Sequence, residues 1–277
     1  MPSFDVHQHL WPEQLIAALS RRTKPPRLHG SRLELVDGAY DVDLDEHRLE
    51  RRIELLDRDG IDVACISLQP TLGCEADETL VSAYHEGIQE VVAVSGGRLR
   101  ALAYAEQRDG FAGACVSAHR VLDGIEELAA ELRGANQFLF VHPGIPAKAR
   151  ADLPAWWPVV VDYPTQMEAA FLAWVTGVVD PDVPVVFALL AGGAPFQLER
   201  LASRGVAPAV SENVYLDTAS YGRRALELCI ASLGPRRLVY GSDTPVIDSA
   251  PTLRALRDLG DAVATAACEG NPARLLA

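Results

Sequence analysis

Positive charge is scarce in this chain. Its 25 lysines and arginines stand against 38 aspartates and glutamates, so the formal net charge at pH 7 is −13. A surface that binds nucleic acid neutralises phosphates with clustered Lys and Arg. The charge balance therefore argues against a nucleic-acid partner, and the acidic surface otherwise indicates only solubility.

A long hydrophobic run is also missing. The longest apolar stretch, residues 183–196, contains two prolines and two glycines and is too short to cross a bilayer. The first apolar strand is expected within three residues of Met1, which leaves no space for a signal peptide. We expect no membrane partner and a cytoplasmic location.

Two further patterns are absent. The five cysteines show no Cys-x-x-Cys spacing and lie in apolar stretches, so we expect reduced, mostly buried thiols and assign none of them to a metal. No glycine-rich dinucleotide loop follows the first expected strand. This absence argues against an open, doubly wound sheet.

The chain does contain a regular alternation of short apolar segments and longer amphipathic stretches. Eight segments are expected as strands: 4–6, 63–68, 99–105, 113–117, 138–141, 185–190, 214–217 and 237–240. Helical patterns lie between them at 45–59, 78–94, 122–132, 166–178, 196–204 and 223–233. Eight such units in 277 residues predict an α/β protein with a single-domain TIM (β/α)8 barrel, whose active site lies at the carboxyl ends of the strands.

One connection is too long for a compact barrel. Residues 10–44, after the first expected strand, contain a Pro-Pro pair and several Gly and Asp residues. Loops of this length are usually functional or disordered. We therefore expect residues 10–44 to form a loop that covers the barrel mouth.

The end of the first strand carries two histidines, His7 and His9, separated by one residue. Side chains alternate along a strand, so both imidazoles point the same way and can converge on one metal ion. The alternative is two polar side chains that merely face solvent at a strand end. His142 after the fifth strand and Asp243 after the eighth complete an N3O set that suits a divalent, zinc-like ion. Taken singly, His142 could be a core histidine and Asp243 a turn former or helix cap.

Several segments, in order along the chain, carry a family resemblance. They are Asp-Val-His-Gln-His-Leu-Trp-Pro at 5–12, Asp-Gly-Ile-Asp at 59–62, Val-His-Pro at 141–143, Gly-Ser-Asp-Thr-Pro at 241–245 and Gly-Asn-Pro-Ala-Arg-Leu-Leu at 270–276. With these segments the chain resembles the amidohydrolase-related family, specifically its aminocarboxymuconate semialdehyde decarboxylase-like branch. The resemblance covers nearly the whole chain.

The resemblance implies a distorted TIM barrel with one divalent metal, most often Zn2+, held by His7, His9, His142 and Asp243. Two-metal relatives bridge their ions with a carboxylated lysine from strand four. The only lysines here are Lys24, in the long loop, and Lys148, after strand five, so a mononuclear site follows. The resemblance also makes a homodimer plausible, as does the frequency of two-fold assemblies.

One departure from the family pattern affects the chemistry. The family places a catalytic histidine on strand six in a pattern like Ala-His-Gly-Gly-Gly-x-x-Pro, and this chain has Leu189 there and no histidine after His142. Three consequences are open. Asp243 takes the proton from a metal-activated water, or His119 at the end of strand four supplies the missing imidazole, or turnover is slow or absent. Alternatively, His119 simply begins a surface loop.

Other residues near the expected mouth are candidates for contacts with a small-molecule substrate. Trp11 could form an apolar rim, although packing of a loop explains it equally well. Gln69 could reach a substrate oxygen or cap the following turn. Asp217 could contact substrate, accept a hydrogen bond from a ligand histidine, or be a structural strand-end carboxylate.

The sequence thus predicts a metal-dependent enzyme of the amidohydrolase-related family that acts on a small cyclic or carboxylated organic molecule. Hydrolysis through metal-activated water is the first prediction, because it needs only the ligands that remain, with Asp243 and His119 as catalytic candidates. Non-oxidative decarboxylation of an aromatic or enoic acid is the alternative. A non-catalytic metal- or ligand-binding barrel is the alternative from another class, because of Leu189.

Overall fold

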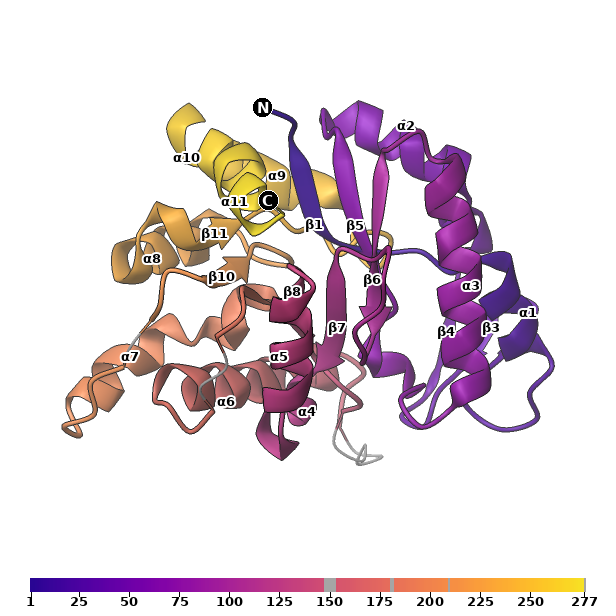
Figure 1. Ribbon diagram of the computed structural model, residues 1–277, viewed down its shortest axis with the longest axis horizontal. Coiled ribbons are helices and arrows are strands. Elements are labelled where there is room, and N and C mark those ends of the chain that lie inside the picture. The colour runs from indigo at the N-terminus through magenta and orange to yellow at the C-terminus, as the bar shows by residue number, and fades with distance from the viewer. Residues whose placement is uncertain (147–152, 180–181, 209, 277) are drawn as a thin grey trace.

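The computed structural model describes residues 1–146, 153–179, 182–208 and 210–276. Eight parallel strands form one sheet in the order β1-β5-β6-β7-β8-β9-β10-β11 (Figure 1). Their bounds are β1 Phe4–His9, β5 Val63–Ser67, β6 Leu99–Tyr104, β7 Gly113–Ser117, β8 Phe138–His142, β9 Val185–Phe187, β10 Val214–Asp217 and β11 Leu238–Val239. A strand is present at each of the eight predicted positions, and the predicted TIM barrel is confirmed. The predicted strand at 185–190 is too long, because β9 ends at Phe187 and Leu189 begins a turn.

The sheet closes where the last strand meets the first. The backbone amide of Val6 donates to the carbonyl of Tyr240 at 2.9 Å, and that of His9 donates to the carbonyl of Thr244 at 2.7 Å. The amide of Asp243 donates to the carbonyl of His7 at 2.8 Å. These bonds join β1 to β11 and to the segment that follows it, and they place residues 7 and 243 side by side.

Helices surround the barrel. The longer ones are α2 Leu49–Asp59, α3 Glu78–Val94, α5 Glu126–Gly134, α6 Tyr163–Val175, α7 Pro195–Ala202, α8 Arg223–Leu233 and α9 Ser249–Arg257. In Figure 1, α2 and α3 flank the side of β5 and β6, and α8 lies beside β10 and β11. The predicted helices at 78–94 and 223–233 have the bounds of α3 and α8.

The predicted helix at 122–132 is wrong in one respect, because the structure divides it. Helix α4 (Ala118–Asp123) ends at Gly124, whose φ of +120° leaves the helical region, and α5 begins at Glu126. Glycine reaches such a conformation without the steric cost that a side chain brings. The predicted helix at 45–59 likewise begins later, at Leu49, after a short 3-10 turn at Leu44–His47.

The long connection after β1 has its own secondary structure. It contains α1 (Glu13–Ser20) and a three-stranded antiparallel sheet of β2 (Arg27–His29), β3 (Arg32–Glu34) and β4 (Ala39–Asp41). The expectation of a loop over residues 10–44 is therefore wrong about the internal structure of this segment. In Figure 1, β3 and β4 are drawn on the same side of the molecule as α1 and α3, and α1 contacts both α3 and β2. We call residues 27–41 the insertion sheet.

The cysteines occupy buried positions in strands, helices and loops of the fold. All five cysteines, Cys65, Cys74, Cys115, Cys229 and Cys268, are free and buried, as predicted. Burial raises the pKa of the Cys65 thiol to about 12, so this side chain is a packed, unreactive thiol.

Within the described residues, no helix is long and apolar enough to cross a membrane.

Candidate metal centre

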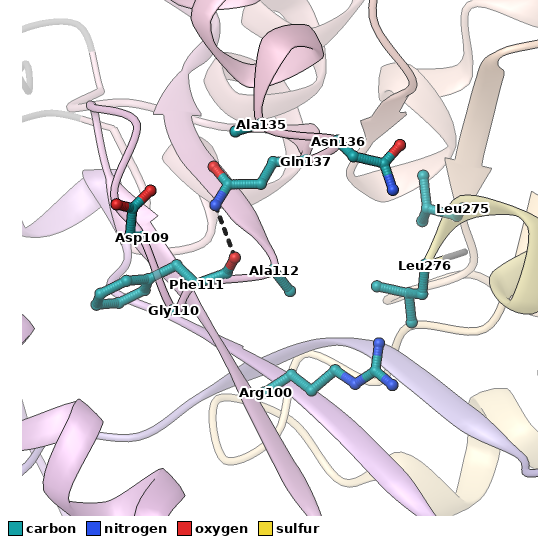
Figure 2. Close-up of a pocket in the computed structure, with 10 residues that line it drawn as sticks. All are labelled: Arg100, Asp109, Gly110, Phe111, Ala112, Ala135, Asn136, Gln137, Leu275 and Leu276. Atoms are coloured by element: carbon teal, nitrogen blue, oxygen red, sulfur yellow. Dashed lines mark hydrogen bonds between the residues drawn. The ribbon is translucent and has the colours of Figure 1, made fainter.

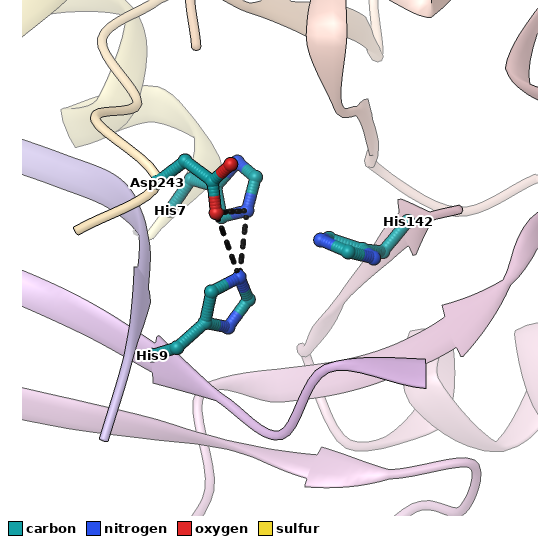
Figure 3. Close-up of side chains that lie close together, drawn as sticks. All are labelled: His7, His9, His142 and Asp243. Atoms are coloured by element: carbon teal, nitrogen blue, oxygen red, sulfur yellow. Dashed lines mark hydrogen bonds and ion pairs between the residues drawn. The ribbon is translucent and has the colours of Figure 1, made fainter. Parts of the chain in front are cut away.

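Four polar side chains meet at the carboxyl end of the barrel strands. His7 and His9 lie at the end of β1, His142 is the last residue of β8, and Asp243 follows β11 (Figure 3). One ligand atom from each lies within 4.8 Å of the corresponding atoms of the other three. The structure thus brings together all four predicted metal ligands.

The separations between ligand atoms suit a small divalent ion. His7 Nε2 lies 3.1 Å from His9 Nε2, and Asp243 Oδ1 lies 3.4 Å from His7 Nε2 and 3.1 Å from His9 Nε2. Tetrahedral ligation with metal–ligand bonds of about 2.0–2.1 Å requires ligand atoms to be about 3.3 Å apart. The imidazole rings are mutually near-perpendicular, with interplanar angles of 82°, 86° and 83°. This donor set fits one divalent metal ion.

Each histidine is oriented by a hydrogen bond from its other ring nitrogen. His7 Nδ1 donates to Asp217 Oδ2 at 2.7 Å and His9 Nδ1 donates to the Ser67 carbonyl at 3.0 Å. His142 Nδ1 donates to the Pro143 carbonyl at 2.9 Å. These acceptors fix the Nδ1–H tautomer in each ring, which leaves Nε2 with its lone pair for the ion.

The electrostatics of the cluster also favour a cation. Burial alone lowers the pKa of His7, but the charges of Asp217 and Asp243 outweigh it and raise the pKa to about 9. Burial is the main reason that the pKa of His9 and of His142 falls below its usual value. Burial raises the pKa of Asp243, but the charge of His7 and its contacts with His9 more than offset this, so the net shift is downward. The raised pKa keeps His7 protonated at neutral pH when no metal is bound, whereas His9 and His142 are neutral and Asp243 is ionised. The negative charge that stabilises the His7 proton also favours a metal cation in its place.

Asp217 has a clear role in the structure. It is fully buried, and besides accepting from His7 its Oδ1 accepts from the backbone amides of Leu189 at 2.9 Å and Ala219 at 3.0 Å. Of the alternatives open for this residue, the structure supports orientation of a ligand histidine. Gly241 permits the close approach, since a Cβ there would lie 2.8 Å from His7 Cβ and 3.0 Å from Asp217 Cγ.

Arg52 is a supporting residue that sequence reasoning missed. This fully buried side chain of α2 donates to the carbonyls of His9 at 2.9 Å and Thr244 at 3.2 Å, and to Gln8 Oε1 at 2.8 Å. It thereby ties the end of β1 to the segment that carries Asp243. Its sequence neighbourhood, an arginine-rich amphipathic helix, gives no signal for burial, because such arginines are usually exposed.

Trp11 and Gln69 are bonded to each other. The Trp11 indole N–H donates to Gln69 Oε1 at 2.8 Å, and its ring stacks on His47 with centroids 4.5 Å apart. Both residues are buried, and Gln69 makes no side-chain cap to the following turn. Packing thus explains both residues, and their contact with substrate stays a prediction.

His119 lies apart from the four ligands. It is exposed in the first turn of α4, immediately after β7, and its Nδ1 would lie 3.0 Å from a Cβ built on Gly144. This places it at the carboxyl end of the barrel, beside Gly144, which lies two residues after His142. Its role as a substitute base stays a prediction.

The turn that follows β9 has an unusual backbone. Leu189, Leu190 and Ala191 have φ values of 55°, 48° and 52°, and Gly192 continues at 69°. Left-handed backbone costs a residue with a side chain about 1–2 kcal/mol. The Leu189 amide is held by Asp217, and a Cβ on Gly192 would overlap the carbonyl oxygen of Pro164 in α6. Packing against α6 and bonding to Asp217 thus hold a strained turn next to the ligands.

A cavity of about 310 Å³ lies elsewhere, at the opposite end of the barrel (Figure 2). Its lining includes Arg100 near the start of β6, Ala112 before β7, Gln137 before β8 and Leu276 near the chain end. Sites in TIM barrels lie at the carboxyl ends of strands, whereas this cavity lies at the amino ends. The four-ligand centre, at the carboxyl ends, lies where the fold leads us to expect the active site.

The fold and the centre define a class of protein, a TIM barrel with a three-histidine, one-carboxylate metal centre. Residues 4–277 match the model of the amidohydrolase family, and the chain belongs to this family. The predicted family is confirmed, and so is the prediction of a metal-dependent enzyme. No curated protein matches the chain.

Solved structures similar to this chain include an IDCase and two decarboxylases. IDCase from Metarhizium anisopliae is 20% identical, with 99% of this chain and 97% of that chain covered and a TM-score of 0.78. The 5-carboxyvanillate decarboxylase LigW from Sphingomonas paucimobilis is 18% identical, with 99% of this chain and 98% of that chain covered and a TM-score of 0.75. The dihydroxybenzoic acid decarboxylase from Polaromonas sp. JS666, whose structure has bound manganese and the inhibitor 2-nitroresorcinol, is 17% identical. In this comparison 99% of this chain and 96% of that chain are covered, and the TM-score is 0.69. At these identities the likeness shows the fold.

Replacing Asp243 by asparagine is expected to reduce metal binding by the purified protein. The neutral amide removes the one anionic ligand and its attraction for the cation. The measurement is the metal content after dialysis, by elemental analysis. Asp182→Asn, at an exposed carboxylate, is the control. Equal metal in Asp243→Asn and the wild type would show that the ligand assignment is wrong.

Proposed function

We propose that this chain is a metal-dependent, non-oxidative decarboxylase of a small carboxylated organic molecule. The observation that carries the proposal is the buried His7, His9, His142 and Asp243 centre, formed in an amidohydrolase-family barrel that resembles several decarboxylase structures. The sequence alone favours hydrolysis over decarboxylation. The similarity to decarboxylase structures supports the opposite preference.

In the proposed reaction the carbon–carboxylate bond breaks, carbon dioxide leaves, and the electron pair remains on the substrate carbon, which then takes a proton. A bound divalent metal supplies positive charge that orients the substrate and stabilises the developing negative charge. The chain's own residues hold the ligands in place: Asp217 orients His7, and Arg52 fixes the carbonyl of His9. Asp243 Oδ1 faces His7 and His9 (Figure 3), and in the proposed reaction its second carboxylate oxygen takes a proton from solvent and passes it to the substrate carbon.

We further propose zinc as the ion, because three imidazoles and one carboxylate suit Zn2+. The manganese in the Polaromonas structure makes Mn2+ the competing identity. Elemental analysis of protein purified without added metal, followed by reconstitution with each metal in turn, distinguishes the two. The substrate and the predicted homodimer stay predictions.

The test of the proposed function is carbon dioxide release by the metal-loaded protein from a panel of aromatic and enoic acids, run beside lactones and amides. We expect release from at least one acid, and loss of that release in Asp243→Asn. Turnover of a lactone or amide without carbon dioxide release from any acid would instead establish the hydrolase. Absence of both reactions would favour the binding protein.

Leu189→His is expected to raise the rate of carbon dioxide release at unchanged metal content. Leu189 is largely buried, with 8% of its surface exposed, at the turn where the family resemblance places a catalytic histidine. A positioned imidazole typically contributes about 10²-fold or more through proton transfer. The measurement is kcat beside the metal content, with Leu189→Gln as a polar control of similar size. An unchanged kcat would show that the site does not use this position.

A further inference from the structure

Gln69 uses only one end of its side-chain amide within the chain. Its Oε1 accepts a hydrogen bond from the Trp11 indole N–H at 2.8 Å, and an indole N–H can only donate, so this contact fixes the orientation of the amide. Among the described residues Nε2 has no acceptor, and it is not one of the unpartnered side-chain atoms that are shut off from solvent. The NH2 group therefore meets solvent-accessible space as a free donor.

The strand register places this amide near the metal ligands. His9 of β1 pairs with Ser67 of β5, and the Ser67 hydroxyl oxygen lies 3.2 Å from His9 Nδ1, so the Ser67 side chain points into the barrel. Gln69 follows two residues later with an extended backbone, φ −71° and ψ 123°, and side chains two apart share a face of a strand. Two residues advance the chain by about 7 Å. The Gln69 amide thus lies on the inner face, one side-chain layer nearer the barrel mouth than the Ser67–His9 contact.

The segment after Gln69 crosses the carboxyl end of the barrel. The 3-10 turn Pro70–Leu72 contacts β7, although β6 lies between β5 and β7 in the sheet. A Cβ built on Gly73 would lie 3.0 Å from Cδ1 of Ile145, which is three residues after the ligand His142. The segment that begins at Gln69 therefore runs over the inside of the barrel, and it does not turn outward among the helices until it has passed the ligands.

Trp11, which orients the Gln69 amide, is itself held at two points. Its ring stacks on His47 with centroids 4.5 Å apart and an interplanar angle of 11°, and its backbone amide donates to His47 Nδ1 at 3.0 Å. His47 is buried in the turn between the insertion sheet and α2. These contacts fix the indole, and the indole in turn fixes which end of the Gln69 amide faces the mouth.

We propose that Gln69 binds the substrate through its NH2 group, which donates to an oxygen of the bound molecule, and that Trp11 is the residue that positions this group. The acceptor is a carboxylate or carbonyl oxygen that lies beyond the group bound at the metal centre. This assignment rests on the proposed function and narrows the substrate to acids that carry a second oxygen-bearing group. A molecule that presents an N–H group at this point sets donor against donor and binds poorly.

The test is ligand binding to the cobalt-loaded protein, followed by the visible absorption of the cobalt. The probes are malonate, succinate and glutarate, whose second carboxylates reach different distances from the metal, and azide, which has no oxygen. We expect Gln69→Leu to weaken the binding of at least one dicarboxylate about tenfold at unchanged cobalt content, because a hydrogen bond to a charged acceptor is lost. Azide should bind the wild type and Gln69→Leu equally. Gln69→Glu, which can still accept from Trp11 but cannot donate, should weaken the same dicarboxylate further.

Gln137→Leu is the matched control for loss of a buried side-chain amide. Gln137 lies at the opposite end of the barrel, where its Nε2 donates to the carbonyls of Arg108 and Phe111, each at 2.8 Å (Figure 2). We expect this variant to bind the dicarboxylates as the wild type does.

Trp11→Phe tests the positioning role. Phenylalanine keeps an aromatic ring beside His47 but has no N–H to orient the Gln69 amide. We expect a smaller loss of dicarboxylate affinity than in Gln69→Leu. Because Trp11 acts through Gln69, the variant with both substitutions should bind as Gln69→Leu alone does. Losses that add in the double variant would contradict the positioning role.

Three results would overturn the proposal. The first is a ratio of dicarboxylate to azide affinity that is equal in the wild type, Gln69→Leu and Gln69→Glu. The second is a wild type that binds azide but none of the dicarboxylates. The third is loss of cobalt from the Gln69 variants, because the residue would then support the metal ligands and not the bound molecule. Failure of the proposed function is distinct, since it appears as absence of carbon dioxide release while the dicarboxylates still bind.

Discussion

Gly192→Ala is expected to destabilise the fold by about 3 kcal/mol or more, the largest effect on stability among the substitutions considered. Gly192 has a φ of +69°, and a Cβ there would overlap the carbonyl oxygen of Pro164 in α6. Overpacking of a tight contact typically costs about 1–3 kcal/mol, and a left-handed residue with a side chain adds about 1–2 kcal/mol. The measurement is the free energy of unfolding from urea denaturation.

Gly193→Ala is the matched control for this prediction. Its φ is also positive, at +88°, but the nearest atom to a Cβ there is Phe196 Cδ2 at 3.9 Å. Only the cost of the backbone conformation then remains, about 1–2 kcal/mol. Equal free energies of unfolding for the two variants would contradict the view that contact between the turn and α6 determines this backbone.

Asp217→Asn is expected to weaken divalent-metal binding by about 10- to 100-fold without removing any ligand. The carboxylate accepts the Nδ1 proton of His7 at 2.7 Å, and an amide that turns its NH2 group toward His7 favours the other tautomer. The proton then lies on Nε2, which faces the ion. The measurement is the dissociation constant for zinc by competition with a chelator.

Two control measurements accompany the prediction for Asp217→Asn. Asp182→Asn, at an exposed carboxylate paired with Arg133, is expected to bind zinc as the wild type does. The free energy of unfolding of metal-free Asp217→Asn tests whether the amide oxygen keeps the bonds from the Leu189 and Ala219 backbone amides. Wild-type zinc affinity in Asp217→Asn would show that this acceptor does not control the tautomer of His7.

The ligand set was predictable because its signal is local and periodic. His7 and His9 share a face by strand alternation, and His142 and Asp243 follow apolar segments that read clearly as strands. The carboxyl ends of parallel barrel strands lie at one end of the molecule, so residues far apart in sequence were expected to meet there. The four ligand atoms within 4.8 Å of one another agree with that reasoning.

The supporting contacts were not predictable to the same degree. Asp217 had three open roles, and only the 2.7 Å distance to His7 Nδ1 selects one of them. Arg52 looks like an ordinary surface arginine in sequence, yet it lies fully buried against the carbonyl of His9. Trp11 and Gln69 are 58 positions apart, and their hydrogen bond uses polar groups that the sequence left free for substrate.

The sequence by itself predicted the barrel, the four side chains that meet at its carboxyl end and the buried state of the cysteines, because each follows from the periodicity and type of residues within short segments. Tertiary structure alone decided which acceptor orients each imidazole and how the turn at Leu189 is held. These features depend on distances between side chains from different strands and helices. Such distances are set by packing of the whole barrel, and no local pattern in the sequence encodes them.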